Sequence, residues 1–348
     1  MMAEYGRFPR VAALILAAAL ILAAVAEPAC AADKGPADFL RREEVVIGVT
    51  DSGLGGLAVV AGLSRRLKDA HPFRRVQIVF QNALFSNQSG YNSLSSRRQK
   101  IEIFDRCLRS MQENYRPDVI LIACNTLSVL LEGTRFAQKK AVPVKGVVDA
   151  GVELIAQKLK QDESSQVAIL GTETTIGEGA YQRRLWEMGF ARQRVIAQAC
   201  PELQAYIERG FDSEETKVLI SAYVDEVLQK KKKGAPLFVS FNCTHYGYAL
   251  AAWQEAFAEF NCPVEAFLDP TPHMVDFIFA GPRAKRFKDT FTDIKAVSMV
   301  PIAPQSMASL GRYFAGVSRE TAQALAGYEL RENLFAWRDI VKRTQTPR

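Results

Sequence analysis

The chain has 348 residues, of which 48% are hydrophobic and 24% charged, and its formal net charge is +6. This length is long for one ordinary domain and sufficient for two, and the composition is that of a globular protein. The mild positive charge, without a basic stripe that alternates with aromatic residues, argues against a nucleic-acid partner. It is compatible with an anionic small-molecule substrate.

Residues 1–31 are typical of a secretory signal peptide. Arg7 and Arg10 precede an uninterrupted apolar run over 11–26, and small residues flank a cleavage position after Ala31. The run is short for a membrane-spanning helix, which needs roughly 20 residues. We therefore expect a periplasmic or secreted protein with no stable membrane anchor after cleavage. An uncleaved anchor or a misassigned start are the alternatives.

From residue 45 onward, β-branched apolar runs alternate with amphipathic stretches. Strands are predicted at 45–49, 76–80, 119–123, 144–148, 167–170, 195–199, 237–241 and 264–268. Helices are predicted at 97–114, 151–160, 178–188 and 214–230. Continuous apolar strands separated by helices indicate a parallel sheet covered on both faces, which is the doubly wound α/β class. In this class, ligands bind beyond the carboxyl ends of the strands.

The chain is predicted to form two lobes, with Pro143 and Pro263 near the crossings between them. The expected segments are 32–142 and 263–290 for the first lobe, 143–262 for the second lobe, and 291–348 for a C-terminal extension that packs on the core. Within the extension we expect an apolar run at 296–300, a loop at 301–304 and a helix from 320 to 341.

Two cysteines stand in nearly the same local sequence. Cys124 and Cys243 each follow a buried strand and precede small polar residues and a helical segment. Asp51 and Thr172 follow earlier strands at similar spacings, since 124 − 51 = 73 and 243 − 172 = 71. The chain therefore contains two copies of one layout, and two facing lobes would place the thiols on opposite sides of one cleft. Because a helix start favours the thiolate, two such thiols indicate a two-base mechanism.

Other interpretations of these motifs are weaker. Gly53, Gly55 and Gly56 do not have the spacing of a dinucleotide-binding loop, and they suit a tight turn that approaches a ligand closely. Asp51 is either a helix cap or a ligand for a substrate ammonium group. The three histidines are widely separated, which argues against a metal site, so His245 is either structural or a partner of the Cys243 thiol.

The remaining cysteines of the mature chain are interpreted as small buried hydrophobes. They are Cys107, Cys200 and Cys262. The five mature cysteines are an odd number, which is not the pattern of a disulfide framework. Free catalytic thiols would conflict with an oxidising compartment, although export is still what residues 1–31 predict.

Four motifs in order resemble those of the glutamate racemases of the aspartate/glutamate racemase superfamily. They are 51–56 (DSGLGG), 123–126 (ACNT), 171–175 (GTETT) and 243–246 (CTHY). The similarity extends from about residue 45 to 272. It implies two pseudo-symmetric α/β lobes with the active site between them, a small acidic amino acid as substrate, and no cofactor or metal. A homodimer is left open.

The resemblance also implies a role for each matching residue. Cys124 would take the α-proton from the D-isomer and Cys243 from the L-isomer, with Asp51, His245 and, less closely matched, Glu208 as their assistants. The groups that would hold the amino and carboxylate ends of the substrate are Asp51, Ser52, Asn125, Thr126, Thr172, Thr175, Thr244 and His245, with Tyr91 and Asn92 in place of a family Pro-Tyr-Gly turn. The product would supply D-glutamate for peptidoglycan.

Three features depart from the family pattern. Phe241 and Asn242 replace a usual Leu-Gly pair, Gly247 replaces a usual proline, and the segment around Tyr91 is longer. We therefore keep an aspartate racemase or a related isomerase or decarboxylase as one alternative. An exported, non-catalytic protein that binds an acidic metabolite is the other.

Overall fold

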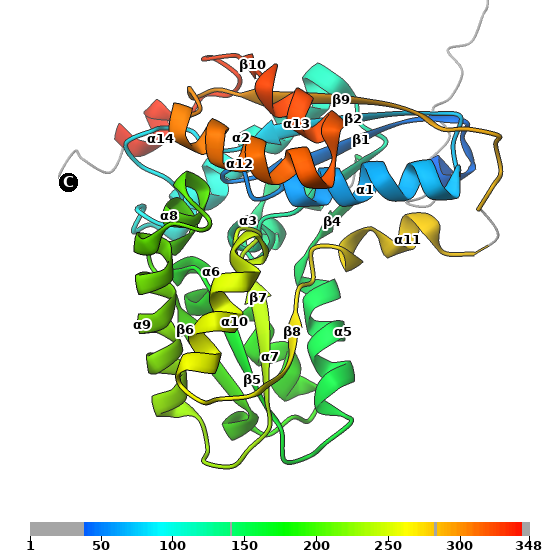
Figure 1. Cartoon of the computed structure of the whole chain (residues 1–348). Helices are drawn as coiled ribbons and strands as arrows, with labels where there is room; N and C mark the ends of the chain where they lie inside the picture. The colour runs from blue at the N-terminus through cyan, green and yellow to red at the C-terminus, as the bar shows by residue number, and fades with distance from the viewer. Residues whose placement is uncertain (1–37, 140, 282–283, 343–348) are drawn as a thin grey trace, which may run out of the picture. The chain divides into compact units, whose positions relative to one another are not determined.

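The computed structural model describes residues 38–139, 141–281 and 284–342, and it contains two parallel β-sheets (Figure 1). The first sheet has the strand order β10-β9-β2-β1-β3-β4 and the second has the order β6-β5-β7-β8. The strands are β1 (Glu44–Asp51), β2 (Arg75–Asn82), β3 (Val119–Ile122), β4 (Val144–Gly146), β5 (Gln166–Gly171), β6 (Val195–Ala199), β7 (Leu237–Asn242), β8 (Val264–Leu268), β9 (Phe291–Ser298) and β10 (Glu329–Leu330). We call the first sheet with its covering helices the first lobe, and the second sheet with its helices the second lobe.

Helices cover the faces of both sheets. They are α1 (Leu57–Ala70), α2 (Arg97–Tyr115), α3 (Asn125–Ser128), α4 (Arg135–Lys139), α5 (Val148–Leu159), α6 (Glu173–Glu178), α7 (Ala180–Glu187), α8 (Leu203–Arg209), α9 (Glu214–Lys230), α10 (Leu250–Glu259), α11 (Asp276–Phe279), α12 (Pro304–Val317), α13 (Arg319–Ala326) and α14 (Arg338–Lys342). Short 3-10 helices lie at Asp38–Arg41, Leu131–Gly133, Arg192–Arg194, Tyr246–Ala249 and His273–Val275. The prediction of a doubly wound α/β fold is confirmed.

The two sheets repeat one strand order. The order β2-β1-β3-β4 in the first sheet corresponds to β6-β5-β7-β8 in the second, and all these neighbours are parallel. The central strands are fully buried because apolar, often β-branched side chains line both faces. This duplicated order is the structural form of the repeat that the sequence predicts.

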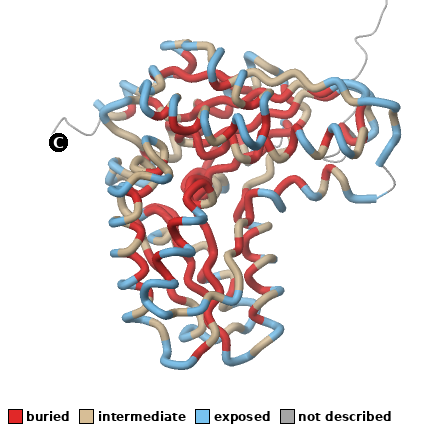
Figure 2. Tube along the Cα trace, in the orientation of Figure 1, coloured by how far each residue is buried: buried red, intermediate tan, exposed pale blue. Residues whose placement is uncertain are grey.

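A continuous buried core joins the lobes. One cluster of apolar side chains extends from Val49 and Leu63 in the first lobe to Leu170, Val239 and Trp253 in the second. Figure 2 shows the buried chain concentrated in the strands and in the helix faces turned toward them. Two further clusters fill the opposite faces, one under α2 and α14 and the other under α5 and α7.

Several predicted elements differ from the observed ones. The predicted strand 144–148 ends at Gly146, and α5 begins at Val148 rather than at residue 151, because valines at these positions favour a strand locally but pack as the first turn of a helix. The predicted helix 178–188 corresponds to α7, which begins only at Ala180 because Gly179, whose φ of 62° is left-handed, separates it from α6. The helix predicted from 320 to 341 is wrong, since α13, β10 and α14 share this segment.

The C-terminal segment extends the first sheet. β9 pairs with β2 over eight residues, and β10 pairs with β9. β8 pairs with β7 and so belongs to the second sheet, although the predicted boundary returns the chain to the first lobe at residue 263. The lobe boundaries themselves stay a prediction. The strand pairings show only to which sheet each strand belongs.

Candidate active site

The motifs of the repeat lie at the carboxyl ends of neighbouring central strands. β1 ends at Asp51 beside β3, which leads into Cys124, and β5 leads into Thr172 beside β7, which leads into Cys243. Parallel strands bring their carboxyl ends to one edge of a sheet, so each sheet presents one thiol and one polar turn there.

Both thiols line one cavity of about 380 Å³. Cys124 is 5% exposed and Cys243 is 6% exposed. Nearly all the predicted site residues line this cavity: Asp51, Ser52, Tyr91, Asn92, Cys124, Asn125, Thr126, Thr172, Glu208, Cys243, Thr244 and His245. A molecule in the cavity would therefore have a thiol from each lobe beside it.

The first thiol has a hydroxyl neighbour. Ser52 Oγ lies 3.1 Å from Cys124 Sγ. Burial, followed by the charge of Asp51, raises the pKa of Cys124 to about 12, against the weaker effect of the Ser52 hydrogen bond. The expectation that a helix start favours the thiolate is wrong for this cysteine, because α3 has only four residues and burial outweighs its dipole.

The second thiol stands beside an imidazole that is held by a carboxylate. His245 Nδ1 lies 3.8 Å from Cys243 Sγ, and His245 Nε2 lies 2.8 Å from Glu208 Oε2. Burial disfavours the charged ring, but the hydrogen bonds to Cys243 and Glu208 outweigh burial and raise the pKa of His245 well above its usual value. A protonated His245 would stabilise a thiolate at Cys243.

Asp51 is a first-lobe carboxyl that contacts the second lobe. Thr244 Oγ1 donates a hydrogen bond of 2.9 Å to Asp51 Oδ2, and the Gly53 amide donates to Oδ1. Burial raises the pKa of Asp51 to about 6, despite the nearby His245 and the Thr244 hydrogen bond, which act in the opposite direction. This carboxyl can therefore change its charge near neutral pH.

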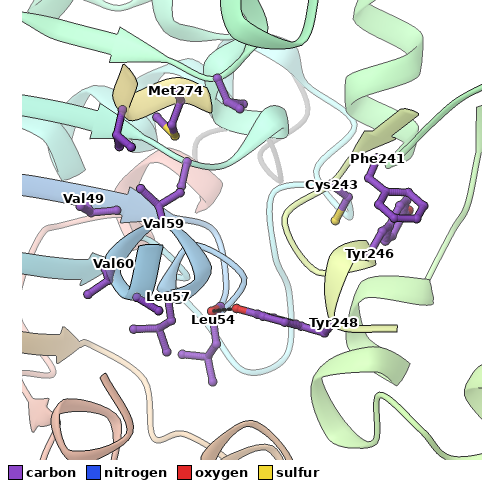
Figure 3. Close-up of a cluster of buried hydrophobic side chains, with 14 of the residues drawn as sticks. Val49, Leu54, Leu57, Val59, Val60, Phe241, Cys243, Tyr246, Tyr248 and Met274 are labelled. Atoms are coloured by element: carbon purple, nitrogen blue, oxygen red, sulfur yellow. Dashed lines mark hydrogen bonds between the residues drawn. The ribbon is translucent and has the colours of Figure 1, made fainter. Parts of the chain in front are cut away.

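Further hydrogen bonds join the two lobes around the cavity. The hydroxyls of Thr126 and Thr172 lie 2.8 Å apart. Glu208 Oε2 accepts from the Leu54 amide at 3.1 Å. Tyr248 Oη donates to the carbonyl groups of Leu54 and Gly55, and Figure 3 shows this ring reaching from the chain below Tyr246 to Leu54. These bonds fix the position of one thiol-bearing turn relative to the other.

The glycine turn after β1 permits this close contact between the lobes. A Cβ atom on Gly55 would lie 2.1 Å from Thr244 Oγ1 and 2.7 Å from His245 Nδ1. A Cβ atom on Gly53 would lie 3.2 Å from Glu208 Oε2. The sequence predicts that these glycines let the backbone approach a ligand closely. Among the described residues, what Gly53 and Gly55 approach are side chains of the second lobe.

Four buried polar atoms of residues that line the cavity lack a hydrogen-bond partner among the described residues. They are Tyr91 Oη, Asn92 Oδ1, Asn125 Nδ2 and Gln204 Oε1. A buried polar group without a partner costs free energy, so such atoms favour a polar ligand that pairs with them. The cavity therefore suits a small molecule with both hydrogen-bond donors and acceptors.

The structure does not bring every predicted residue to the cavity. Thr175 is fully buried, and its amide and hydroxyl both lie within hydrogen-bond distance of the Thr172 hydroxyl, so it supports Thr172 from the first turn of α6. Conversely, Gln204 and Arg209 line the cavity without having been predicted, and only their place on the helix of Glu208 could have indicated them. Across 38–139, 141–281 and 284–342, no three His, Cys, Asp or Glu side chains gather closely enough to hold a metal ion.

Comparisons with known proteins agree on one family. The chain matches the family described as Asp/Glu/Hydantoin racemase over residues 47–263. The curated glutamate racemase of Aquifex pyrophilus is 32% identical over 202 residues, which are 58% of this chain and 70% of that protein.

Two solved structures share the fold. Glutamate racemase isoform RacE1 of Bacillus anthracis has a TM-score of 0.65 at 18% identity, covering 85% of this chain and all of that one. The glutamate racemase of Francisella tularensis in complex with D-glutamate has a TM-score of 0.60 at 21% identity, covering 82% and 97% of the two chains.

These relatives correct the expected location. Glutamate racemases are normally cytoplasmic enzymes, so the expectation of a periplasmic or secreted protein is not upheld. The predicted leader over 1–31 and its cleavage after Ala31 lie outside the described residues. In the part of the chain that the structure describes, every helix is too short or too polar to cross a membrane.

Proposed function

Because the chain belongs to the Asp/Glu/hydantoin racemase family, we propose that it is a cofactor-independent glutamate racemase, an isomerase that interconverts L- and D-glutamate. The observation that best supports this proposal is the cavity itself, which has a cysteine from each lobe in its wall. Inversion at a carbon atom needs a base on one face and an acid on the other, and two thiols in one cavity can supply both.

The reaction starts with the two thiols in opposite protonation states. For the L-isomer, the Cys243 thiolate takes the α-proton, so the C–H bond breaks and an S–H bond forms. The Cys124 thiol then donates its proton to the opposite face of the carbanion and becomes a thiolate. The D-isomer reacts in the reverse direction, and no electrons are gained or lost overall.

The neighbours of each thiol support these assignments. A charged His245, held by Glu208, stabilises the Cys243 thiolate, while burial keeps Cys124 protonated as the proton donor. Asp51 and Ser52 assist Cys124 from the same lobe. In this arrangement Cys243 is the base that takes the α-proton from the L-isomer, as the family resemblance implies.

The cavity also offers groups to hold the substrate. An acidic amino acid brings carboxylate groups that accept hydrogen bonds and an ammonium group that donates them. Asn125 Nδ2 and Tyr91 Oη are buried donors without a protein partner, and Asn92 Oδ1 is an acceptor suited to the ammonium group. The D-glutamate complex of the Francisella tularensis relative supports an acidic amino acid as the ligand. The product D-glutamate is then available for peptidoglycan synthesis.

The test is racemisation of L-glutamate by the purified protein in heavy water. We expect D-glutamate that carries deuterium at the α-carbon, and the same assay with aspartate measures the selectivity. The substitutions Cys124→Ser and Cys243→Ser should each abolish racemisation. Cys262→Ser is the matched control, because this half-buried thiol does not line the cavity, and it should retain full activity.

Two outcomes would contradict the proposal. One is a wild-type protein that racemises no acidic amino acid. The other is a single-cysteine variant that retains the wild-type rate, which would exclude the two-base mechanism. The homodimer that the sequence leaves open stays a prediction, and the mass of the protein in solution tests it.

A further inference from the structure

Tyr181 is a buried residue behind the cavity wall that the predicted site does not include. It is fully buried in α7, and its hydroxyl donates a hydrogen bond of 2.5 Å to Asn125 Oδ1. Tyr181 comes from the second lobe, whereas Asn125 begins α3 directly after Cys124 in the first lobe. Tyr181 does not itself line the cavity.

The bond from Tyr181 uses one end of the Asn125 amide. Asn125 is 2% exposed and lines the cavity, and its other polar atom, Nδ2, has no partner in the described part of the chain. A side-chain amide offers one acceptor oxygen and two donor hydrogens on nitrogen. With Oδ1 turned toward Tyr181, the donor end is left for a molecule in the cavity.

Two glycines allow Tyr181 to occupy this position. Gly179, with its left-handed φ of 62°, ends α6 and lets α7 start in a new direction two residues before the tyrosine. A Cβ atom on Gly151 of α5 would lie 2.6 Å from Tyr181 Cε1 and 2.8 Å from its hydroxyl oxygen. The Asn242 amide lies beside the same hydroxyl. The hydroxyl is therefore enclosed, so its place is set by packing.

We propose that Tyr181 is a positioning residue that holds the Asn125 amide with its donor end toward a substrate carboxylate. This inference rests on the proposed racemase function and deepens it. Without the hydroxyl, Asn125 Oδ1 would be left buried and unpaired, and the amide would rotate to recover a partner. The carboxylate is present in the substrate and in the transition state alike, so the loss falls mainly on binding.

The test is a double-mutant cycle between Tyr181→Phe and Asn125→Ala. Tyr181→Phe should lower kcat/KM for glutamate by about tenfold, the factor expected for one hydrogen bond, mostly through a higher KM. In the Asn125→Ala background, Tyr181→Phe should cause no further loss. Calorimetry should show a matching rise in the Kd for D-glutamate.

Two further variants separate positioning from structural support. Asn125→Asp keeps an oxygen that accepts from Tyr181 but replaces the Nδ2 donor with a second oxygen. Its kcat/KM should therefore fall as far as that of Asn125→Ala. Tyr223→Phe is the matched control, because this buried second-lobe tyrosine also donates to an oxygen, the Pro201 carbonyl at 2.8 Å, and does not line the cavity. It should leave KM unchanged.

The outcomes also distinguish this inference from the proposed function. If the wild-type protein racemises glutamate but Tyr181→Phe leaves KM and Kd unchanged, or lowers kcat/KM equally in both backgrounds, the inference is overturned and the racemase function stands. If the wild-type protein neither binds nor racemises any acidic amino acid, the racemase function fails and this inference fails with it.

Discussion

At the scale of single residues, the two thiols differ in their surroundings although their local sequences repeat. Burial and Asp51 raise the pKa of Cys124 to about 12, whereas Cys243 has His245 beside it, with a raised pKa of its own. Burial thus favours the protonated thiol at Cys124, while His245 lies beside Cys243, to which the proposed mechanism assigns the thiolate. In the proposed mechanism, removal of the α-proton from the L-isomer needs a thiolate at Cys243 and a thiol at Cys124. Removal from the D-isomer needs the opposite protonation states.

Asp51 links the site to the pH dependence of stability. A carboxyl pKa raised from 3.8 to about 6 means that the folded protein binds the proton more tightly than the unfolded chain. The free energy of unfolding therefore falls as the pH rises through this window, and the ionised Asp51 destabilises the fold above pH 6. At roughly 1.4 kcal/mol per pKa unit, the cost reaches about 3 kcal/mol.

We expect Asp51→Asn to be more stable than the wild type by about 1 to 3 kcal/mol at pH 8, and by little or nothing at pH 4, because asparagine has no charge to bury. Urea unfolding at both pH values measures the difference. The same variant should lose racemisation. A stability difference that is equal at pH 4 and pH 8 would contradict the raised pKa.

Most of the candidate site could be predicted from the sequence because its residues follow strands. The positions after an apolar run, such as Ser52 and Thr244, fall at the carboxyl edge of a parallel sheet whatever the details of packing. Thr175 and Tyr181 could not be assigned in this way. Whether a side chain one turn into a helix faces the cavity or supports a neighbour depends on the helix direction, and Gly179 changes that direction.

At the scale of elements, the turn from Gly53 to Gly56 is one place where the lobes are in direct contact. Glu208 accepts from the Leu54 amide, and Tyr248 donates to the carbonyl groups of Leu54 and Gly55, so the second lobe holds the middle of the turn. Tyr248 in turn packs edge-on against Tyr313 and Phe314 of α12. The helix α12 therefore supports the turn that follows Asp51.

We expect Gly55→Ala to lower kcat/KM by more than about tenfold, because the new Cβ would push Thr244 and His245 away from Asp51, and displacements of about 1 Å are costly in an active site. Overpacking should also lower the free energy of unfolding by about 1 to 3 kcal/mol. Initial rates and urea unfolding measure the two effects.

Gly62→Ala is the matched control for this substitution. Gly62 lies inside α1, and no described atom comes within 4 Å of its added Cβ. Alanine should stabilise the helix by about 0.5 to 1 kcal/mol and leave the rate unchanged. Equal rates for the Gly55 and Gly62 variants would show that the close contact at Gly55 does not matter for catalysis.

The C-terminal elements show why periodicity alone misassigns some segments. Residues 319–326 and 338–342 are both helical, and without a proline between them the pattern suggests one helix from 320 to 341. Gly327 and the pairing of β10 with β9 interrupt it, and such a pairing is a tertiary contact that no local pattern contains. For the eight-residue strand β9 the sequence indicates only an apolar run at 296–300, because the first five residues of the strand include polar side chains and lie at least partly in contact with solvent.

At the scale of the whole molecule, duplication explains how one chain brings two thiols to one cavity. The repeated strand order places a thiol at the same point of each sheet, and the shared core holds the sheets together. The sequence could predict this repeat from the spacing of four motifs. It could not predict that β9 and β10 enlarge only the first sheet, because this asymmetry comes from a segment outside the repeat.

A chain that ends at residue 290 tests the role of the C-terminal segment. It would lose β9, which pairs with β2 over eight residues, and the buried side chains of Val297, Leu310 and Phe314. We expect loss of both cooperative unfolding and racemisation, measured by circular dichroism and rate. A truncated protein that unfolds at the wild-type midpoint and retains activity would show that the segment is merely appended.

The place of β9 in the first sheet has a consequence during synthesis. The ribosome makes β4 before it starts the second lobe, and 291 − 146 = 145 residues separate Gly146 from Phe291. At about 5 to 20 residues per second, the sheet formed by β2, β1, β3 and β4 waits roughly 7 to 29 s, after β4 is made, for the strand that completes the hydrogen bonding of β2. Throughout that interval β2 is an unpaired, apolar edge strand of the nascent chain. Such an edge can bind a chaperone or pair with a strand of a neighbouring nascent chain.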